Sequence, residues 1–278
     1  LSSDIHSQIL LSIARVHIKS WKISEASRYL ERALDIAQQD EQSLRILDIK
    51  REMGMILFYQ AKYTEALDLL KRSLAGAIGT LGDDHPWVVS VLLDIAFIYE
   101  QQWSLNEALR LGKEALVSQK RFFKTNTYHM AKSYDLIGSV YSKQGNYQDA
   151  IKSFDKSLGI LKKYRHKKHM DCLKIYVKIA SAYLKLGDLQ KAIDLIQSCI
   201  KTFEAKNIKD DPVLSRTYLL LGTACFYTRK FYDCIISYTK SWAINTRVFG
   251  PKHPSVANDY QVIGRALTVQ GRYREASE

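Results

Sequence analysis

The sequence has no long apolar run. None of its apolar stretches approaches the ~18 residues that a membrane-spanning helix needs, and the N-terminal residues lack a basic leader. Pro-rich, Ser-rich and other low-complexity stretches are missing too. With 46% hydrophobic and 25% charged residues, the 278-residue chain is predicted to be soluble, cytoplasmic and without a membrane partner.

Sequence motifs of enzymes are also missing. There is no Gly-rich phosphate loop, no H-E-x-x-H and no G-x-S-x-G, and the seven His are scattered along the chain. His85 and His253 each precede a Pro in equivalent connections, which indicates a role in loop geometry rather than a catalytic pair. We therefore predict a protein that is not an enzyme, with no catalytic residues and no cofactor.

Cysteine is scarce, with four residues in the whole chain. A zinc site would need paired short spacings such as C-x-x-C, but the closest pair, Cys225 and Cys234, is nine residues apart with no His nearby. Core packing in a reducing compartment is the expected role of these thiols. No metal site is predicted.

The sequence does contain a repeat of about 42 residues. Small anchor residues recur at spacings of 40 and then 42, namely Ala14, Gly54, Ala96, Gly138, Ala180, Gly222 and Gly264. Twelve residues after each anchor stands a second small residue: Ala26, Ala66, Ala108, Ala150, Ala192, Cys234 and Ala276. Because this register holds seven times, the chain is predicted to consist of repeated structural units.

The segment from His129 to Leu158 shows what one unit should look like. Its apolar residues recur every three or four positions on both sides of Gly145-Asn146, which predicts two amphipathic helices joined by a turn. We therefore predict an all-α fold, a right-handed superhelix of about six and a half helix-turn-helix repeats. The repeats are expected near 5–34, 46–74, 88–116, 130–158, 172–200, 214–242 and 256–278, the last one truncated. They should form a single solenoid over 1–278 that is a segment of a longer protein.

The order of small, aromatic and small marker residues resembles the tetratricopeptide repeat, whose common unit has about 34 residues. Units of about 42 residues joined by Gly-x-x-His-Pro connections are similar to those of the kinesin light chain group. Here the connections run from Gly82 to Pro86 and from Gly250 to Pro254. The resemblance implies an α-solenoid that serves as a scaffold or adaptor for other proteins.

Charge is distributed unevenly along the chain. Residues 1–100 hold 11 Lys and Arg against 14 Asp and Glu, whereas residues 101–250 hold 26 against 12. The net charge of +12 therefore originates in repeats three to six. Part of it is the run from Lys162 to His169, which we interpret as a solvated loop rather than a nuclear import signal or nucleic-acid patch.

The resemblance places the first helix of each pair along a concave groove, and helical periodicity then gives the positions that face it. In repeats four to six these positions combine basic, small polar and apolar side chains. The predicted peptide-binding residues are Lys132, Leu136, Ser139, Lys143, Lys174, Val177, Lys178, Ser181, Lys185, Arg216, Leu220, Thr223 and Tyr227. An apolar floor with basic walls suits an extended acidic peptide.

Kinesin light chains bind peptides in which Trp is flanked by acidic residues, and their repeats commonly carry Asn-Asn ahead of the anchor. This chain has Val177-Lys178 and Leu219-Leu220 at matching positions, so the amide clamp and the identity of the cargo are not carried over. We predict a non-enzymatic scaffold that binds an extended acidic peptide of a protein partner. The alternative is nucleic-acid (RNA) binding through repeats three to six, which is disfavoured because most aromatic residues occupy core positions.

Overall fold

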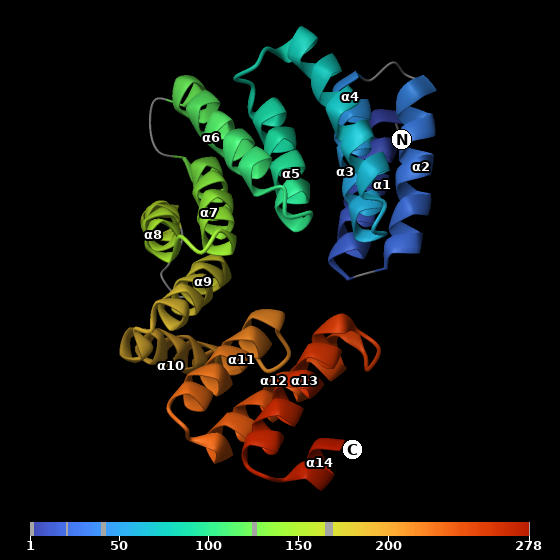
Figure 1. The fold of residues 1–278 in the computed structure, drawn as a ribbon. Helices are drawn as coiled ribbons and strands as arrows, with labels where there is room; N and C mark the ends of the chain where they lie inside the picture. The colour runs from blue at the N-terminus through green and yellow to red at the C-terminus, as the bar shows by residue number, and fades with distance from the viewer. Residues whose placement is uncertain (1–2, 21, 40–42, 124–126, 165–168, 278) are drawn as a thin grey trace. The chain divides into compact units, whose positions relative to one another are not determined.

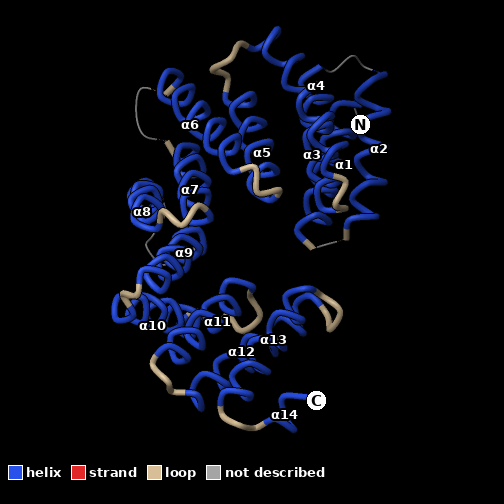
Figure 2. The backbone as a smooth tube through the Cα atoms, in the orientation of Figure 1, coloured by secondary structure: helices blue, strands red, loops and turns tan. Residues whose placement is uncertain are grey.

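The structure is a computed structural model that describes residues 3–20, 22–39, 43–123, 127–164 and 169–277. These residues form fourteen α-helices in consecutive antiparallel pairs (Figure 1). The same residues contain no β-strand (Figure 2). The predicted all-α class, built from helix pairs, is confirmed.

The chain divides into two compact units, residues 1–140 and 141–278. The helices of the first unit are α1 (Ser3–Lys19), α2 (Ile23–Gln39), α3 (Ser43–Tyr59), α4 (Tyr63–Leu81), α5 (Pro86–Gln101) and α6 (Leu105–Phe122). Helix α7 (Tyr128–Lys143) contains the boundary. The second unit holds α8 (Tyr147–Tyr164), α9 (Met170–Leu186), α10 (Leu189–Ala205), α11 (Pro212–Tyr227), α12 (Phe231–Phe249), α13 (Pro254–Val269) and α14 (Tyr273–Ser277). The single solenoid and the repeat limits stay predictions.

Small residues allow the two helices of a pair to approach closely. The small residues predicted for the second helices, namely Ala26, Ala66, Ala108, Ala150, Ala192 and Cys234, are fully buried. A Cβ atom on Gly222 would lie 2.5 Å from Cδ1 of Tyr238, and one on Gly54 would lie 2.7 Å from Cγ of Leu70. At these two anchors no larger side chain fits without a shift of the neighbouring Leu70 or Tyr238 side chain.

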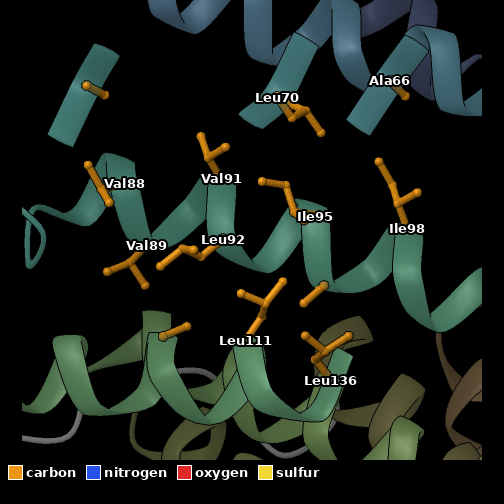
Figure 3. Packing of buried hydrophobic residues seen from close by; sticks show 13 residues of the cluster. Ala66, Leu70, Val88, Val89, Val91, Leu92, Ile95, Ile98, Leu111 and Leu136 are labelled. Carbon is orange, nitrogen blue, oxygen red and sulfur yellow. The ribbon is translucent and has the colours of Figure 1, made fainter. Parts of the chain in front are cut away.

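The core of the first unit is centred on α5. Figure 3 shows Val91 and Ile98 on the side of this helix that faces Leu70 of α4, while Leu111 of α6 faces it from the other side. Because α5 contacts helices on both sides, it is the most uniformly apolar helix of this unit and carries eight buried residues. Each buried aliphatic side chain contributes roughly 1.5–3 kcal/mol of transfer free energy.

In the second unit, the core lies between the paired helices α9 and α10 and continues onto α11. Ala180 of α9 packs with Ala192, Ile196 and Phe203 of α10, and all four side chains are at most 1% exposed. A further cluster holds α12 against α11 and α13 through Tyr238 and Ala266. The second helices α10 and α12 therefore fix the positions of the first helices α9, α11 and α13 relative to one another.

The turns inside the helix pairs require a left-handed backbone conformation. Gly145, Gly187 and Gly271 adopt it with φ near +80°, while Trp103 and Arg229 adopt it at equivalent positions with φ of 61° and 58°. Trp103 thus occupies a position where glycine is favoured. Trp21 stands at the equivalent position of repeat one in the sequence, seven residues after the anchor, and lies outside the described residues.

The connections that precede α5 and α13 end in a histidine cap. The Nδ1 atom of His85 accepts a hydrogen bond from the backbone N–H of Trp87 at 3.2 Å, and Nδ1 of His253 accepts one from Ser255 at 3.2 Å. The following Pro occupies the first helical turn, where its missing N–H has no cost. The repeated His-Pro pair therefore starts helices, in agreement with the loop-geometry interpretation.

The second helix of repeat two is longer than its glycine content indicated. Glycine has a low helix propensity, but α4 continues through Gly76 and Gly79 to Leu81. Ala77 is fully buried and Leu81 packs against the core of the unit, so tertiary contacts compensate for the low helix propensity of the glycines.

Candidate functional site

The first helices of the first unit carry charges that are paired with one another. Nε of Arg15 lies 2.8 Å from Oε1 of Glu52, which links α1 to α3, and the Arg51 guanidinium pairs with Asp94, which links α3 to α5. Burial disfavours the charge of Arg51, but Asp94 and the neighbouring carboxylates outweigh burial and raise its pKa. These charges therefore join successive repeats and neutralise one another.

Three predicted binding residues lie on α7 within the first unit. Lys132 is exposed and Ser139 is half-buried. Leu136 is only 8% exposed and packs in the core with Leu111. Its position follows from contacts with α5 and α6, so it offers little surface to a ligand.

In the second unit, the predicted basic residues of α9 are accessible. Lys174 is exposed and its Nζ lies 4.0 Å from Oδ1 of Asp171, at the limit of an ion pair. Lys178 is half-buried, with Nζ 5.8 Å from the centroid of the Phe154 ring. Val177, between them, is 5% exposed and belongs to the core.

A cavity of about 650 Å³ runs along α11 between α9 and α13. It brings together six predicted residues: Ser181, Lys185, Arg216, Leu220, Thr223 and Tyr227. Lys143, Lys174, Val177 and Lys178 lie in the same unit but do not line this cavity. The cavity is therefore the largest grouping of predicted binding residues within one unit.

The two basic side chains of the cavity, Lys185 and Arg216, are both exposed and form no ion pair with any described residue. Partial burial of the Arg216 guanidinium lowers its pKa, and no acidic side chain within the described residues opposes this effect. An arginine in this environment is a favourable partner for a carboxylate, because its planar group can donate two parallel hydrogen bonds.

A buried polar network forms the wall of the cavity near Arg216. Ser241 Oγ donates to Oδ1 of Asp259 at 2.9 Å, and Nδ2 of Asn245 donates to Oδ2 of the same carboxylate at 2.6 Å. Ser215 Oγ lies 3.0 Å from Ser241 Oγ and must donate to it, since the hydroxyl hydrogen of Ser241 is already used. Burial raises the pKa of Asp259, although these hydrogen bonds oppose the shift. The network joins α11, α12 and α13.

Several cavity residues were missed by the sequence analysis. Asn258 and Val262 line the cavity from α13, and Asn245 and Phe249 line it from α12. Asn258 and Val262 stand six and two residues before the anchor Gly264. Arg216 and Leu220 stand at the same distances before Gly222, so the positions used for repeats four to six would have found the two α13 residues in repeat seven. The two α12 residues carry no such signal, because second helices were not expected to reach the groove.

A second cavity of the same unit lies on the side of its second helices, and two of its basic residues differ from those of the α11 cavity in having partners. This cavity has a volume of about 480 Å³ and is bounded by Tyr218, Lys240 and Arg247. Nζ of Lys240 lies 5.2 Å from the Tyr218 ring centroid, and Nε of Arg247 lies 2.7 Å from Oδ1 of Asp210. Lys240 and Arg247 therefore already have partners, unlike Lys185 and Arg216. In the first unit, a cavity of about 590 Å³ lies among α4, α5 and α6.

Other features noted in the sequence have less bearing on a site. All four cysteines have free thiols, and burial raises the pKa of Cys199 to about 12, which makes this thiol unreactive. Within the described residues, no three His, Cys, Asp or Glu side chains gather as they would around a metal ion. Of the basic run 162–169, residues 165–168 lie outside the described residues.

No helix among the described residues has the length and apolarity needed to cross a membrane.

Comparison with known proteins identifies the repeat. A tetratricopeptide repeat family model matches residues 45–119 and 129–205, more than half of the chain. No curated protein sequence matches the chain significantly.

Solved structures with similar folds have low sequence identity. A putative kinesin light chain with nearly identical TPR-like repeats from Podospora anserina is 19% identical over 72% of this chain and 95% of its own, with a TM-score of 0.58. A signal transduction ATPase with a tetratricopeptide repeat sensor from Pyrococcus horikoshii is 16% identical over 97% of this chain and 40% of its own, with a TM-score of 0.70. NprR in complex with its cognate peptide NprX is 17% identical over 100% of this chain and 76% of its own, with a TM-score of 0.66. The similarity of fold agrees with the family match, and the chain belongs to the tetratricopeptide repeat family.

Proposed function

We propose that this chain is a non-enzymatic scaffold that binds an extended acidic peptide segment of a partner protein. Tetratricopeptide repeat domains generally mediate protein–protein interactions. The first-helix face of the second unit, formed by α9, α11 and α13, is the surface that we assign to the peptide. The free thiols fit a cytoplasmic location, since reducing compartments keep cysteines unpaired.

The observation that carries this proposal is the presence of unpaired cations beside the α11 cavity. In the first unit, Arg15 and Arg51 are neutralised by carboxylates of neighbouring repeats. In the second unit, Lys185 and Arg216 line the cavity without an acidic partner among the described residues. A ligand that supplies carboxylates would provide the missing partners and would be attracted by the basic face.

One structural relative agrees with peptide binding. NprR, which shares the fold at a TM-score of 0.66, was solved in complex with a cognate peptide. A surface of apolar and basic residues can hold an extended peptide through its backbone and its alternating side chains. In the cavity, the exposed Tyr227 supplies apolar area, and Ser181 and Thr223 supply hydroxyl groups.

RNA binding is the second candidate, favoured by the pI of about 9.4 and the basic charge of residues 101–250. Binding of single strands without sequence preference uses aromatic side chains on which bases stack. On the first-helix face of the second unit, Tyr227 is the single aromatic residue among those predicted to bind. This composition supports the peptide over the nucleic acid.

The test is fluorescence anisotropy with a labelled pool of acidic peptides that contain Trp or Leu. The double variant Lys174→Glu with Lys178→Glu should weaken binding at least about tenfold, or about 1.4 kcal/mol, because like charges then face the ligand. The matched control is Lys201→Glu with Lys206→Glu, which changes the net charge equally at two exposed positions of or beside α10. It should leave affinity within about twofold at physiological salt, where screening acts over ~8 Å.

Labelled single- and double-stranded oligonucleotides are measured in parallel at two salt concentrations. Oligonucleotide binding that is tight, falls steeply with salt and weakens equally in both double variants would overturn the peptide proposal in favour of RNA. Peptide binding that both variants lose to the same extent would show attraction to net charge rather than a defined surface.

A further inference from the structure

The two unpaired cations lie toward opposite ends of the α11 cavity. Arg216 lies near the N-terminal end of α11, close to the residues of α13 that begin at Pro254. Tyr227 ends α11, eleven residues later, which corresponds to about 16 Å along a helix at 1.5 Å per residue. The cavity therefore extends along the length of this helix.

Lys185 lies at the same height as Tyr227. Helices α9 and α11 run in the same direction, because each is antiparallel to α10. Lys185 and Tyr227 both stand five residues after the anchor of their repeat, Ala180 and Gly222 respectively. The backbone positions of Lys185 and Arg216 are thus offset by roughly 16 Å along the axes of these helices, and each carries its positive group on a long, flexible side chain.

The surface between these ends is uncharged. Ser181 and Thr223 contribute hydroxyl groups there, and Leu184 and Leu220 contribute an apolar floor that is at most 6% exposed. Among the described residues that line the cavity, Asp259 is the one carboxylate, and it is fully buried with both oxygens bonded to Ser241 and Asn245. Both of its oxygens are therefore already occupied by donors of the protein.

We infer that this cavity selects extended peptides that carry two acidic side chains four residues apart, one bound by Arg216 and the other by Lys185. The inference rests on the proposed function and adds a rule of spacing to it. In an extended chain, residues i and i+4 point to the same side and lie about 13 Å apart, at roughly 3.3 Å per residue. The flexible lysine stem can cover the remaining distance to the second carboxylate.

Other spacings fit the cavity less well. Acidic residues at i and i+2 share a side of the peptide but are only about 7 Å apart, so both cations would have to bend further toward one another to bind them. Adjacent acidic residues point to opposite sides. The fork of Arg216 should contribute more specificity than Lys185, since a guanidinium can bind a carboxylate with two parallel hydrogen bonds and an ammonium acts as a point charge.

The experiment uses labelled nine-residue peptides of Ser and Leu with two Glu residues and blocked termini, so that side chains supply every carboxylate. The peptides differ only in the Glu spacing, which is i+1, i+2 or i+4, and keep the same net charge. Anisotropy titrations should show at least about tenfold tighter binding of the i+4 peptide. The Arg216→Gln variant should reduce this preference to less than about twofold.

The control variant is Arg247→Gln, an exposed arginine on the second-helix side of the same unit. It should keep the full spacing preference, and thermal melts of both variants should match the wild type. Equal affinity for all spacings, with binding still lost in the Lys174 and Lys178 double variant, would overturn this inference and leave the proposed function intact. Failure of the wild type to bind any acidic peptide would overturn both.

Discussion

Glycine at the anchor position has different roles in different repeats. At Gly222 a Cβ would lie 2.5 Å from the Tyr238 ring, whereas at Gly264 the nearest atom, the carbonyl oxygen of Ala276, would be 3.8 Å away. The two glycines occupy equivalent positions in the repeat, but the space available for a side chain beside them differs.

Gly222→Ala should therefore lower the free energy of unfolding by about 1–3 kcal/mol through overpacking. Gly264→Ala should be neutral or stabilising by up to about 1 kcal/mol, because alanine is the better helix former. Urea denaturation of the two variants measures both values. A smaller loss for Gly222→Ala than for Gly264→Ala would contradict the packing that we describe.

Two turn residues provide a second comparison at the residue scale. Arg229 has φ of 58° and Gly187 has φ of +83°, so both adopt the left-handed conformation that costs an L-residue roughly 1–2 kcal/mol. Arg229→Gly should raise the free energy of unfolding by up to about 1 kcal/mol, and Gly187→Ala should lower it by a similar amount. Chemical denaturation should show changes of opposite sign in the free energy of unfolding for the two variants. Changes of the same sign would rule out backbone strain as the cause.

The buried carboxylate of Asp259 should make stability dependent on pH. Burial raises its pKa above the usual value of 3.8, so the folded state holds this proton more tightly than the unfolded state. The resulting stabilisation is complete below about pH 4 and is lost as pH rises through the raised pKa. Each unit of pKa shift corresponds to about 1.4 kcal/mol.

Asp259→Asn removes the titrating carboxyl group but can keep both hydrogen bonds. The amide oxygen of the new Asn can accept from Ser241, and its N–H can donate to the Asn245 side-chain oxygen once the Asn245 amide flips. The variant should gain stability relative to the wild type between pH 4 and 7, as measured by urea denaturation at several pH values. Asp194→Asn, at an exposed position of α10, is the matched control for the loss of a carboxylate from the same unit. A parallel pH dependence of the wild type and Asp259→Asn would exclude Asp259 as the titrating group.

At the scale of the element, helix starts depend on short-range capping. The Nδ1 atom of His85 satisfies the N–H of Trp87, one of the unbonded donors in the first turn of α5. His85→Ala should destabilise the protein by about 1 kcal/mol, and His85→Asp should restore most of this loss, since aspartate is a favourable N-cap. Thermal melts of both variants give the comparison, and equal destabilisation by Ala and Asp would argue against a capping role.

The sequence predicted the helix pairs because they depend on local patterns. Small residues such as Ala150 and Ala192 recur at fixed distances from their anchors, and a helix pair needs small residues where its backbones approach. The end of α4 was not predicted, because the burial of Ala77 and Leu81 depends on packing with other helices. Helix propensity contains no information on such contacts.

Only those residues of the candidate site that stand at fixed distances from a repeat anchor could be predicted from the sequence. Arg216 and Tyr227 were placed by helical periodicity, and the α11 cavity contains both. Asp259 and Asn245 were not found, because their roles depend on hydrogen bonds between α12 and α13. Leu136 was assigned to the groove by its offset but is only 8% exposed, because it packs with residues of α5 and α6; an offset gives direction and not accessibility.

At the scale of the whole molecule, the two units differ in the use of charge. In the first unit, Arg15, Arg45 and Arg51 of the first helices pair with carboxylates of successive first helices. The second unit leaves Lys185 and Arg216 without partners beside a cavity. Ligand binding should therefore depend on the second unit, while the ion pairs of the first unit serve to hold its repeats together.

Photo-crosslinking tests this account most directly, because it reports where a ligand binds without a change in the protein. A labelled peptide with Glu residues at i and i+4 and a benzophenone residue between them is irradiated with the intact chain, and the linked residues are identified by mass spectrometry. The account predicts crosslinks to α9, α11 and α13 that an excess of unlabelled peptide removes. Crosslinks concentrated on α10 and α12, or on the first unit, would contradict it.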